Sequence, residues 1–101
     1  MIGTWEEVET GVRRKIHPPG KNMMMMEVQF EEGAVGAAHS HPHEQYTYCL
    51  KGKLQFTLGD KNIVLTQGES LFIPSGVVHG VVALESSTLL DAFTPLREDL
   101  L

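Results

Sequence analysis

The sequence contains a single cysteine, Cys49, so no disulfide bridge can form within the chain. This excludes the disulfide-held folds of small secreted proteins and suits a reducing compartment. No apolar run approaches the ~18 to 20 residues of a membrane span. The first residues also lack the basic start and apolar stretch of a signal peptide. We therefore expect a cytoplasmic protein that has no membrane partner.

Positive charge is scarce as well. Eight lysines and arginines stand against thirteen aspartates and glutamates, which gives a net charge of -5 at pH 7. A nucleic-acid binder needs a basic face that displaces counterions from phosphate groups. The only basic run, Arg13-Arg14-Lys15, follows several glutamates and is typical of a solvated edge. We expect no nucleic-acid partner.

Helical periodicity is the third absence, because no window between residues 20 and 92 repeats apolar side chains every 3.6 residues. Glycine and proline instead divide the chain into short segments rich in β-formers. The expected strands cover residues 23–30, 46–50, 54–58, 63–66, 70–73 and 77–84. Many short strands without helical crossovers predict an all-β, antiparallel sandwich or small barrel. We expect a hairpin tip at residues 59–62 and a tight reversal at residues 51–53.

The length of 101 residues fits one domain, because domains cluster near ~100 to 150 residues. Residues 1–20 are less regular and end in Pro18-Pro19-Gly20, so we interpret them as an N-terminal arm with one or two edge strands. The run of methionines that follows suggests soft-metal ligation. In a strand, however, Met24 and Met26 would share one face, and we interpret them as core side chains.

Histidine is in surplus, with five in the chain and three of them at positions 39, 41 and 43. Residues i and i+2 of a strand face the same way with Cα atoms ~6 to 7 Å apart, so His39 and His41 can reach one ion. Gln45 would lie roughly 13 Å beyond His41 if the strand continued at ~3.3 Å per residue. Pro42 indicates that the strand ends and the chain reverses, which would turn Gln45 back towards the histidines.

His79 is the candidate fourth ligand, since it stands in an apolar stretch where an unpartnered imidazole would be costly to bury. The alternative for His79 taken alone is a surface or hydrogen-bonded residue. We expect His17, beside two prolines in the arm, to be a surface residue.

Two motifs resemble those of the cupin superfamily. Residues 33–52, Gly33-x5-His39-x-His41-x3-Gln45-x6-Gly52, resemble the first cupin motif with glutamine in place of the usual glutamate. Residues 68–82, which contain Gly68-x5-Pro74-x-Gly76-x2-His79, resemble the second. The resemblance implies a single-domain, jelly-roll-like β-barrel of six to eight strands over residues 1–101. It also implies one divalent metal, here on His39, His41, Gln45 and His79.

The glutamine leaves two alternatives for the fourth ligand, Glu44 and His43, of which Glu44 has the wrong strand parity if Gln45 faces inward. Three imidazoles and one amide are neutral, so the +2 charge would favour an anionic substrate. The metal can be Mn, Fe, Co, Ni, Cu or Zn, since all accept such ligands.

The two ends of the chain resemble small cupins of the bacterial pectin-degradation type, in Trp5-Glu6-x5-Gly11-Val12-x-Arg14 and Asp91-x-Phe93-x-Pro95-x-Arg97-x-Asp99. This resemblance implies an isomerase of carbohydrate metabolism that converts 4,5-unsaturated uronates into linear keto forms. Asp91 would move a proton and Arg97 would clamp the uronate carboxylate, as catalytic residues. Phe93 and His43 would contact the substrate.

Three other interpretations stay open. A metal-dependent oxygenase is possible, although a neutral glutamine departs from the 2-His-1-carboxylate pattern. A cupin that binds a small molecule or sugar without catalysis is the second, and a structural barrel with an incidental metal is the third.

A chain of this size has much surface for its volume, and it has more apolar strands than a single inner face can bury. We therefore expect a homodimer that buries one sheet face.

Overall fold

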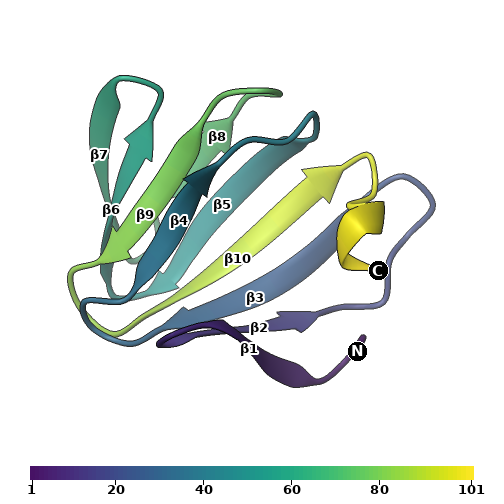
Figure 1. The fold of residues 1–101 in the computed structure, drawn as a ribbon, viewed down its shortest axis with the longest axis horizontal. Coiled ribbons are helices and arrows are strands. Elements are labelled where there is room, and N and C mark those ends of the chain that lie inside the picture. Colours follow the sequence, from purple (N-terminus) through teal and green to yellow (C-terminus); the bar gives the residue numbers. More distant parts are fainter.

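Ten strands form two antiparallel sheets that face one another in the computed structural model, which describes residues 1–101 (Figure 1). The strands are β1 (Trp5–Glu9), β2 (Val12–Ile16), β3 (Met24–Phe30), β4 (Val35–His39), β5 (Glu44–Lys51), β6 (Lys53–Leu58), β7 (Lys61–Thr66), β8 (Ser70–Ile73), β9 (His79–Ala83) and β10 (Ser87–Thr94). The one helix is a 3-10 turn, η1 (Glu98–Leu100), and no helix is long and apolar enough to span a membrane. The predicted all-β, antiparallel class is confirmed.

The larger sheet has the order β1-β2-β3-β10-β5-β8, and the smaller has the order β4-β9-β6-β7. Ten strands exceed the expected six to eight because the N-terminal residues form a hairpin, β1–β2, that extends the larger sheet. β1 is the edge strand and β2 pairs with β3. The chain therefore presents the inner faces of two sheets to a shared interior.

Two turns differ from their expected form. Leu58 pairs with Lys61, so the β6–β7 hairpin has only Gly59 and Asp60 in its loop, and the expected four-residue tip is two residues too long. Gly52 lies between β5 and β6, which belong to different sheets, so the expected reversal is a passage from one sheet to the other. Its φ of 94° and the close backbone of residues 86 and 87 leave no room for a side chain.

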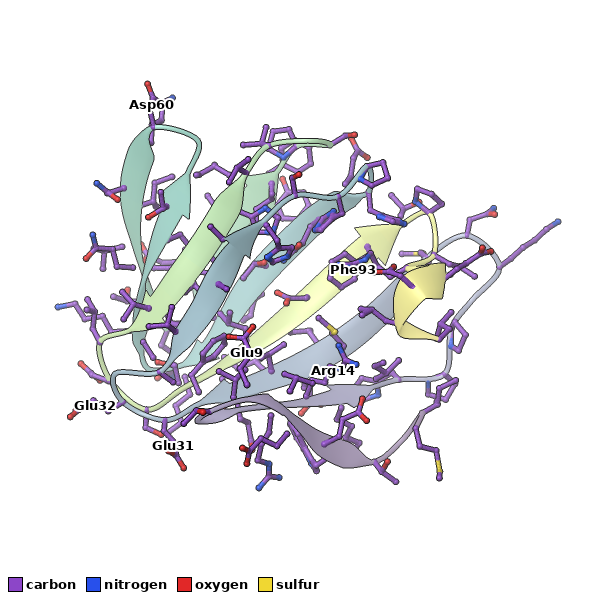
Figure 2. The ribbon with its side chains drawn as sticks, viewed as in Figure 1. Glu9, Arg14, Glu31, Glu32, Asp60 and Phe93 are labelled. Carbon is purple, nitrogen blue, oxygen red and sulfur yellow. The ribbon has the colours of Figure 1, made fainter.

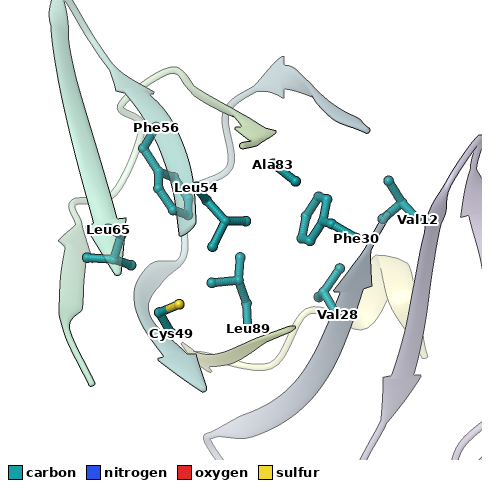
Figure 3. Close-up of a cluster of buried hydrophobic side chains, with 9 residues drawn as sticks. All are labelled: Val12, Val28, Phe30, Cys49, Leu54, Phe56, Leu65, Ala83 and Leu89. Atoms are coloured by element: carbon teal, nitrogen blue, oxygen red, sulfur yellow. The ribbon is translucent and has the colours of Figure 1, made fainter. Parts of the chain in front are cut away.

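Strict alternation places one side of each central strand in the interior, as in β5, where exposed and buried residues alternate from residue 44 to 49. The apolar half of the interior holds one cluster of nine buried side chains (Figure 3). Its members are Val12, Val28, Phe30, Cys49, Leu54, Phe56, Leu65, Ala83 and Leu89. Buried polar side chains, among them Gln45, Thr47, His79 and Asp91, occupy the other half.

A second, smaller cluster closes the barrel beside η1. Ile16, Met24 and Phe93 are buried there, and Leu96 and Leu100 of the C-terminal segment pack against them. Met24 is 2% exposed and accepts a hydrogen bond at its sulfur from the backbone N–H of Arg97 at 3.1 Å. Met24 is therefore a core side chain that anchors the C-terminal segment, as the strand parity of the methionine run predicted.

Candidate metal centre

Three histidines meet in the polar half of the interior. His39 is the last residue of β4 and pairs with His79, the first residue of β9. His41 lies in the connection between β4 and β5, so it does not share a strand with His39 as expected. The strand ends at His39, three residues before Pro42, and the turn brings His41 to the same point.

The three imidazoles are close enough to share one ion. Their ring centroids lie 4.4 Å apart for His39 and His79, 5.0 Å for His41 and His79, and 5.6 Å for His39 and His41. One ligand atom from each lies within 4.8 Å of the others, and His41 and His79 are buried. The group can hold a metal ion.

Each of these imidazoles is oriented by a hydrogen bond from Nδ1 to a backbone carbonyl. The acceptors are Ala37 for His39, His43 for His41 and Val77 for His79, at 2.9, 3.0 and 2.9 Å. A carbonyl only accepts, so Nδ1 carries the proton and Nε2 presents its lone pair.

The protonation of the two buried imidazoles also suits a metal. Burial lowers the pKa of His41 and His79, which favours the neutral, metal-ligating form. Nε2 of His79 is buried and has no hydrogen-bond partner. A buried nitrogen without a partner is costly, and a cation at the centre of the three rings would satisfy it. The three histidines therefore fit the implied metal.

Gln45 faces inward from β5 and extends this arrangement. Its Oε1 lies 3.0 Å from Nε2 of His41. Because Nδ1 of His41 donates to a carbonyl, both atoms of this contact present lone pairs. Two lone pairs at that separation repel each other unless a proton or a cation lies between them.

A chain of hydrogen bonds fixes the Gln45 amide. Its Nε2 donates to Oγ1 of Thr47 at 2.9 Å, and the Thr47 hydroxyl donates to Oδ1 of Asp91 at 2.8 Å. Burial raises the pKa of Asp91 to about 6, although its bonds to Thr47 and Gln45 work in the opposite direction. Asp91 is thus a buried carboxyl poised to exchange a proton near neutral pH.

Other predicted residues have different surroundings. Glu44 is exposed on the outer face, as strand parity requires. His43 lines an outer groove, and its Nε2 donates to the backbone carbonyl of Leu96 at 3.0 Å. His17 is only partly buried and forms a hydrogen bond with Glu27 at 3.1 Å. The His43 ring meets the His41 ring edge-on at 5.5 Å, so His43 lies beside the cluster, but none of the three belongs to the group that can share one ion.

Phe93 and Arg97 border the centre. The Phe93 ring meets the His41 ring edge-on at 5.7 Å, and the Arg97 guanidinium lies 5.2 Å from the Phe93 centroid. Arg97 also makes a bidentate pair with Asp99, at 3.0 Å from Nε and 2.7 Å from Nη2. The Arg97 fork is therefore already engaged by a carboxylate of the chain itself.

A cavity of about 410 Å³ joins these groups. Its polar lining includes His39, Gln45, His79, Asp91 and Arg97, and Phe93 lies at the same wall. Thr47 was not predicted from the sequence, although its strand parity with Gln45 places it in the interior. Arg14, which also lines the cavity, was not predicted either.

A family model described as a cupin domain matches residues 26–92. The chain belongs to the cupin family. The pectin degradation protein KdgF of Dickeya dadantii (strain 3937) is 36% identical to this cupin over 99 residues, which cover 96% of this chain and 90% of the relative.

Solved structures agree with that assignment. KdgF from Halomonas sp. superposes with a TM-score of 0.92 at 37% identity, covering 97% of this cupin and 91% of that chain. An RmlC-like cupin from Shewanella frigidimarina NCIMB 400 gives a TM-score of 0.92 at 32% identity, with 98% and 89% covered. The single-domain cupin fold and the similarity to the pectin-degradation type are confirmed.

Proposed function

We propose that this cupin is a metal-dependent isomerase that converts 4,5-unsaturated uronates into their linear keto forms. The observation that supports this most is the buried path from His41 through Gln45 and Thr47 to Asp91, which links the histidine cluster to a carboxyl whose pKa is about 6. The KdgF relative is named for pectin degradation, a process that concerns uronate polymers.

The centre would hold one divalent transition metal on His39, His41, His79 and Oε1 of Gln45. The lone pair of Gln45 already points at the cluster, because the Thr47 hydroxyl accepts the amide N–H. When bound, the metal supplies a Lewis acid that polarises an oxygen of the substrate. All four ligands are neutral, so the remaining positive charge favours an anionic small molecule.

Asp91 is the proposed proton carrier. As a carboxylate it removes the proton of the C1 hydroxyl, the bond from C1 to the ring oxygen breaks, and its electron pair stays on that oxygen. The resulting enolate takes the same proton from Asp91 at C4 and becomes the C5 ketone. One proton moves from oxygen to carbon, nothing is oxidised, and Asp91 ends in the form in which it began.

Arg97 and Phe93 are assigned supporting roles in the same cavity. The guanidinium of Arg97 adds positive charge where the enolate develops. Phe93 offers an apolar wall against the sugar ring, and its packing against Arg97 and His41 keeps both in place. His43 would act at the rim, where it ties the β4–β5 connection to the C-terminal segment.

The deciding experiment mixes the metal-loaded protein with freshly lyase-generated unsaturated uronate and follows its ultraviolet absorbance. Protonation at C4 removes the conjugated double bond, so we expect the absorbance to fall faster than in buffer. Chelated protein and the Asp91→Asn variant should both lose the acceleration. No acceleration by the metal-loaded wild type would overturn the proposal, and oxygen uptake with candidate substrates would then test an oxygenase.

A further inference from the structure

Arg14 is a charged side chain on the inner face of the barrel. It lies on β2 between Val12 and Ile16, which are both buried and face the interior, whereas its neighbour Arg13 is exposed. The Arg14 side chain is 23% exposed and lines the cavity that contains the histidine cluster (Figure 2). A partly buried arginine among apolar residues calls for an anionic partner.

Within the chain, Glu6 pairs with only one of the three guanidinium nitrogens of Arg14. Its Nε donates to Oε1 of Glu6 at 3.0 Å, from the neighbouring edge strand. The two terminal nitrogens, Nη1 and Nη2, make no hydrogen bond in the structure. These are the atoms with which an arginine grips a carboxylate bidentately.

Arg97, the other cation of the cavity, is engaged differently. Asp99 occupies both Nε and Nη2 of Arg97 in a bidentate pair. A substrate carboxylate would have to displace Asp99 before Arg97 could clamp it. Arg14 can bind the same carboxylate through its two terminal nitrogens while Nε keeps its bond to Glu6.

The register of the larger sheet sets the separation of Arg14 from the reacting groups. β10 pairs with β3 and β3 with β2, so Asp91 aligns with Met26 and Ile16, one inward-facing position from Arg14. The Cα atoms of Asp91 and Arg14 are thus offset by about 10 Å across two strands and about 7 Å along them. An extended arginine and a six-carbon sugar acid together span that offset.

We propose that Arg14 binds the carboxylate of the substrate and thereby selects sugar acids over neutral sugars. This deepens the proposed function and rests on it for the identity of the substrate. Glu9, an exposed residue at the end of β1, lines the cavity as well.

The test compares five single variants for ketonisation: Arg14→Gln, Arg14→Lys, Arg97→Gln, Glu6→Gln and Arg13→Gln. Loss of a charged hydrogen bond to the substrate should raise KM for Arg14→Gln by about tenfold or more, with kcat changed much less. Arg14→Lys should recover part of the affinity. Glu6→Gln should keep a low KM because Arg14 remains, and Arg13→Gln, whose guanidinium stacks on Trp5 at the exposed face, should match the wild type.

A binding measurement separates this proposal from the reaction. Glucuronate and glucose are titrated into the metal-loaded protein and followed by NMR. The wild type should bind glucuronate more tightly than glucose, and Arg14→Gln should bind the two with similar affinity. If the wild type fails to ketonise yet shows this difference, the proposed function fails and the role of Arg14 stands. Unchanged KM and glucuronate affinity in Arg14→Gln, an equal loss in Glu6→Gln, or a rise in KM confined to Arg97→Gln would each overturn the role of Arg14.

Discussion

Thr47 and Asp91 lie directly opposite each other on β5 and β10, and the Thr47 hydroxyl donates to the Asp91 carboxyl at 2.8 Å. Thr47 is 0% exposed, and it also accepts the amide N–H of Gln45. One hydroxyl therefore orients the proposed fourth ligand and tunes the proposed proton carrier.

Thr47→Val keeps the shape of the side chain and removes that hydroxyl. We expect a loss of about 1 to 3 kcal/mol in the free energy of unfolding, because buried polar groups on Gln45 and Asp91 lose a partner. Since the bond from Thr47 lowers the pKa of Asp91, the acid limb of the pH–rate profile should move to higher pH. Urea unfolding and a pH series of initial rates measure the two effects. Thr47→Ser is the control: it keeps the hydroxyl, so the pH–rate profile should stay near wild type, and unfolding should lose only the contribution of one buried methyl group, about 1 kcal/mol.

The raised pKa of Asp91 makes the stability of the metal-free protein depend on pH. The pKa of Asp91 is 3.8 in the unfolded chain and about 6 in the folded protein, so the folded state binds this proton more tightly. Ionisation of Asp91 therefore opposes folding, with no effect below about pH 4 and a full cost above about pH 6. Asp91→Asn should be more stable than wild type by about 2 to 3 kcal/mol at pH 8 and equal to it at pH 4. Equal differences at both values, by urea unfolding in a chelator, would contradict this.

Metal content tests the histidine cluster independently of any reaction. Protein purified without added metal should carry close to one transition metal per chain, by elemental analysis. His79→Ala and the His39→Ala/His41→Ala double variant should lose most of it, since they remove Nε2 ligands. His17→Ala is the matched control, because His17 interacts with Glu27 on β3. Full occupancy in the double variant would refute the site.

We expect the homodimer to bury the outer face of the larger sheet. Met25, Ala92, Tyr46 and Phe72 align across β3, β10, β5 and β8, and Tyr46 is 57% exposed. Tyr46→Glu should convert the expected homodimer into a monomer, because a buried unpaired charge is costly at an interface. Light scattering after size exclusion measures the mass. Val64→Glu, exposed on β7 of the other sheet, should leave it unchanged.

The sequence predicted the sheets better than the ends of the strands. Alternation of apolar residues identified the middle of β5, but the strand begins at Glu44 because ladder hydrogen bonds with β10 recruit polar residues too. β1 has three glutamates in five residues, and it is a strand because β2 pairs with it. Pairing partners far apart in the sequence decide such boundaries, and local patterns do not contain them.

In the site, spacing predicted the histidines that converge and the family resemblance supplied Asp91, but neither predicted Thr47, which links them across strands. His39 and His79 meet because their motifs lie on paired strands. Asp91 reaches the cluster through Thr47, and that link exists only once the register of β5 and β10 is known. The basic run predicts a solvated Arg14, whereas side-chain alternation along β2 turns Arg14 inward while Arg13 stays outside.

The division of the interior has a consequence for protein engineering. The apolar cluster that includes Leu54 and Leu89 contains none of the proposed ligands, although β5 and β9 contribute to both. On these two strands, separate stretches supply the buried apolar side chains and the proposed ligands. New ligand sets can be installed at positions 39, 41, 45 and 79 with the cluster untouched, which makes this small barrel a frame for designed metalloenzymes.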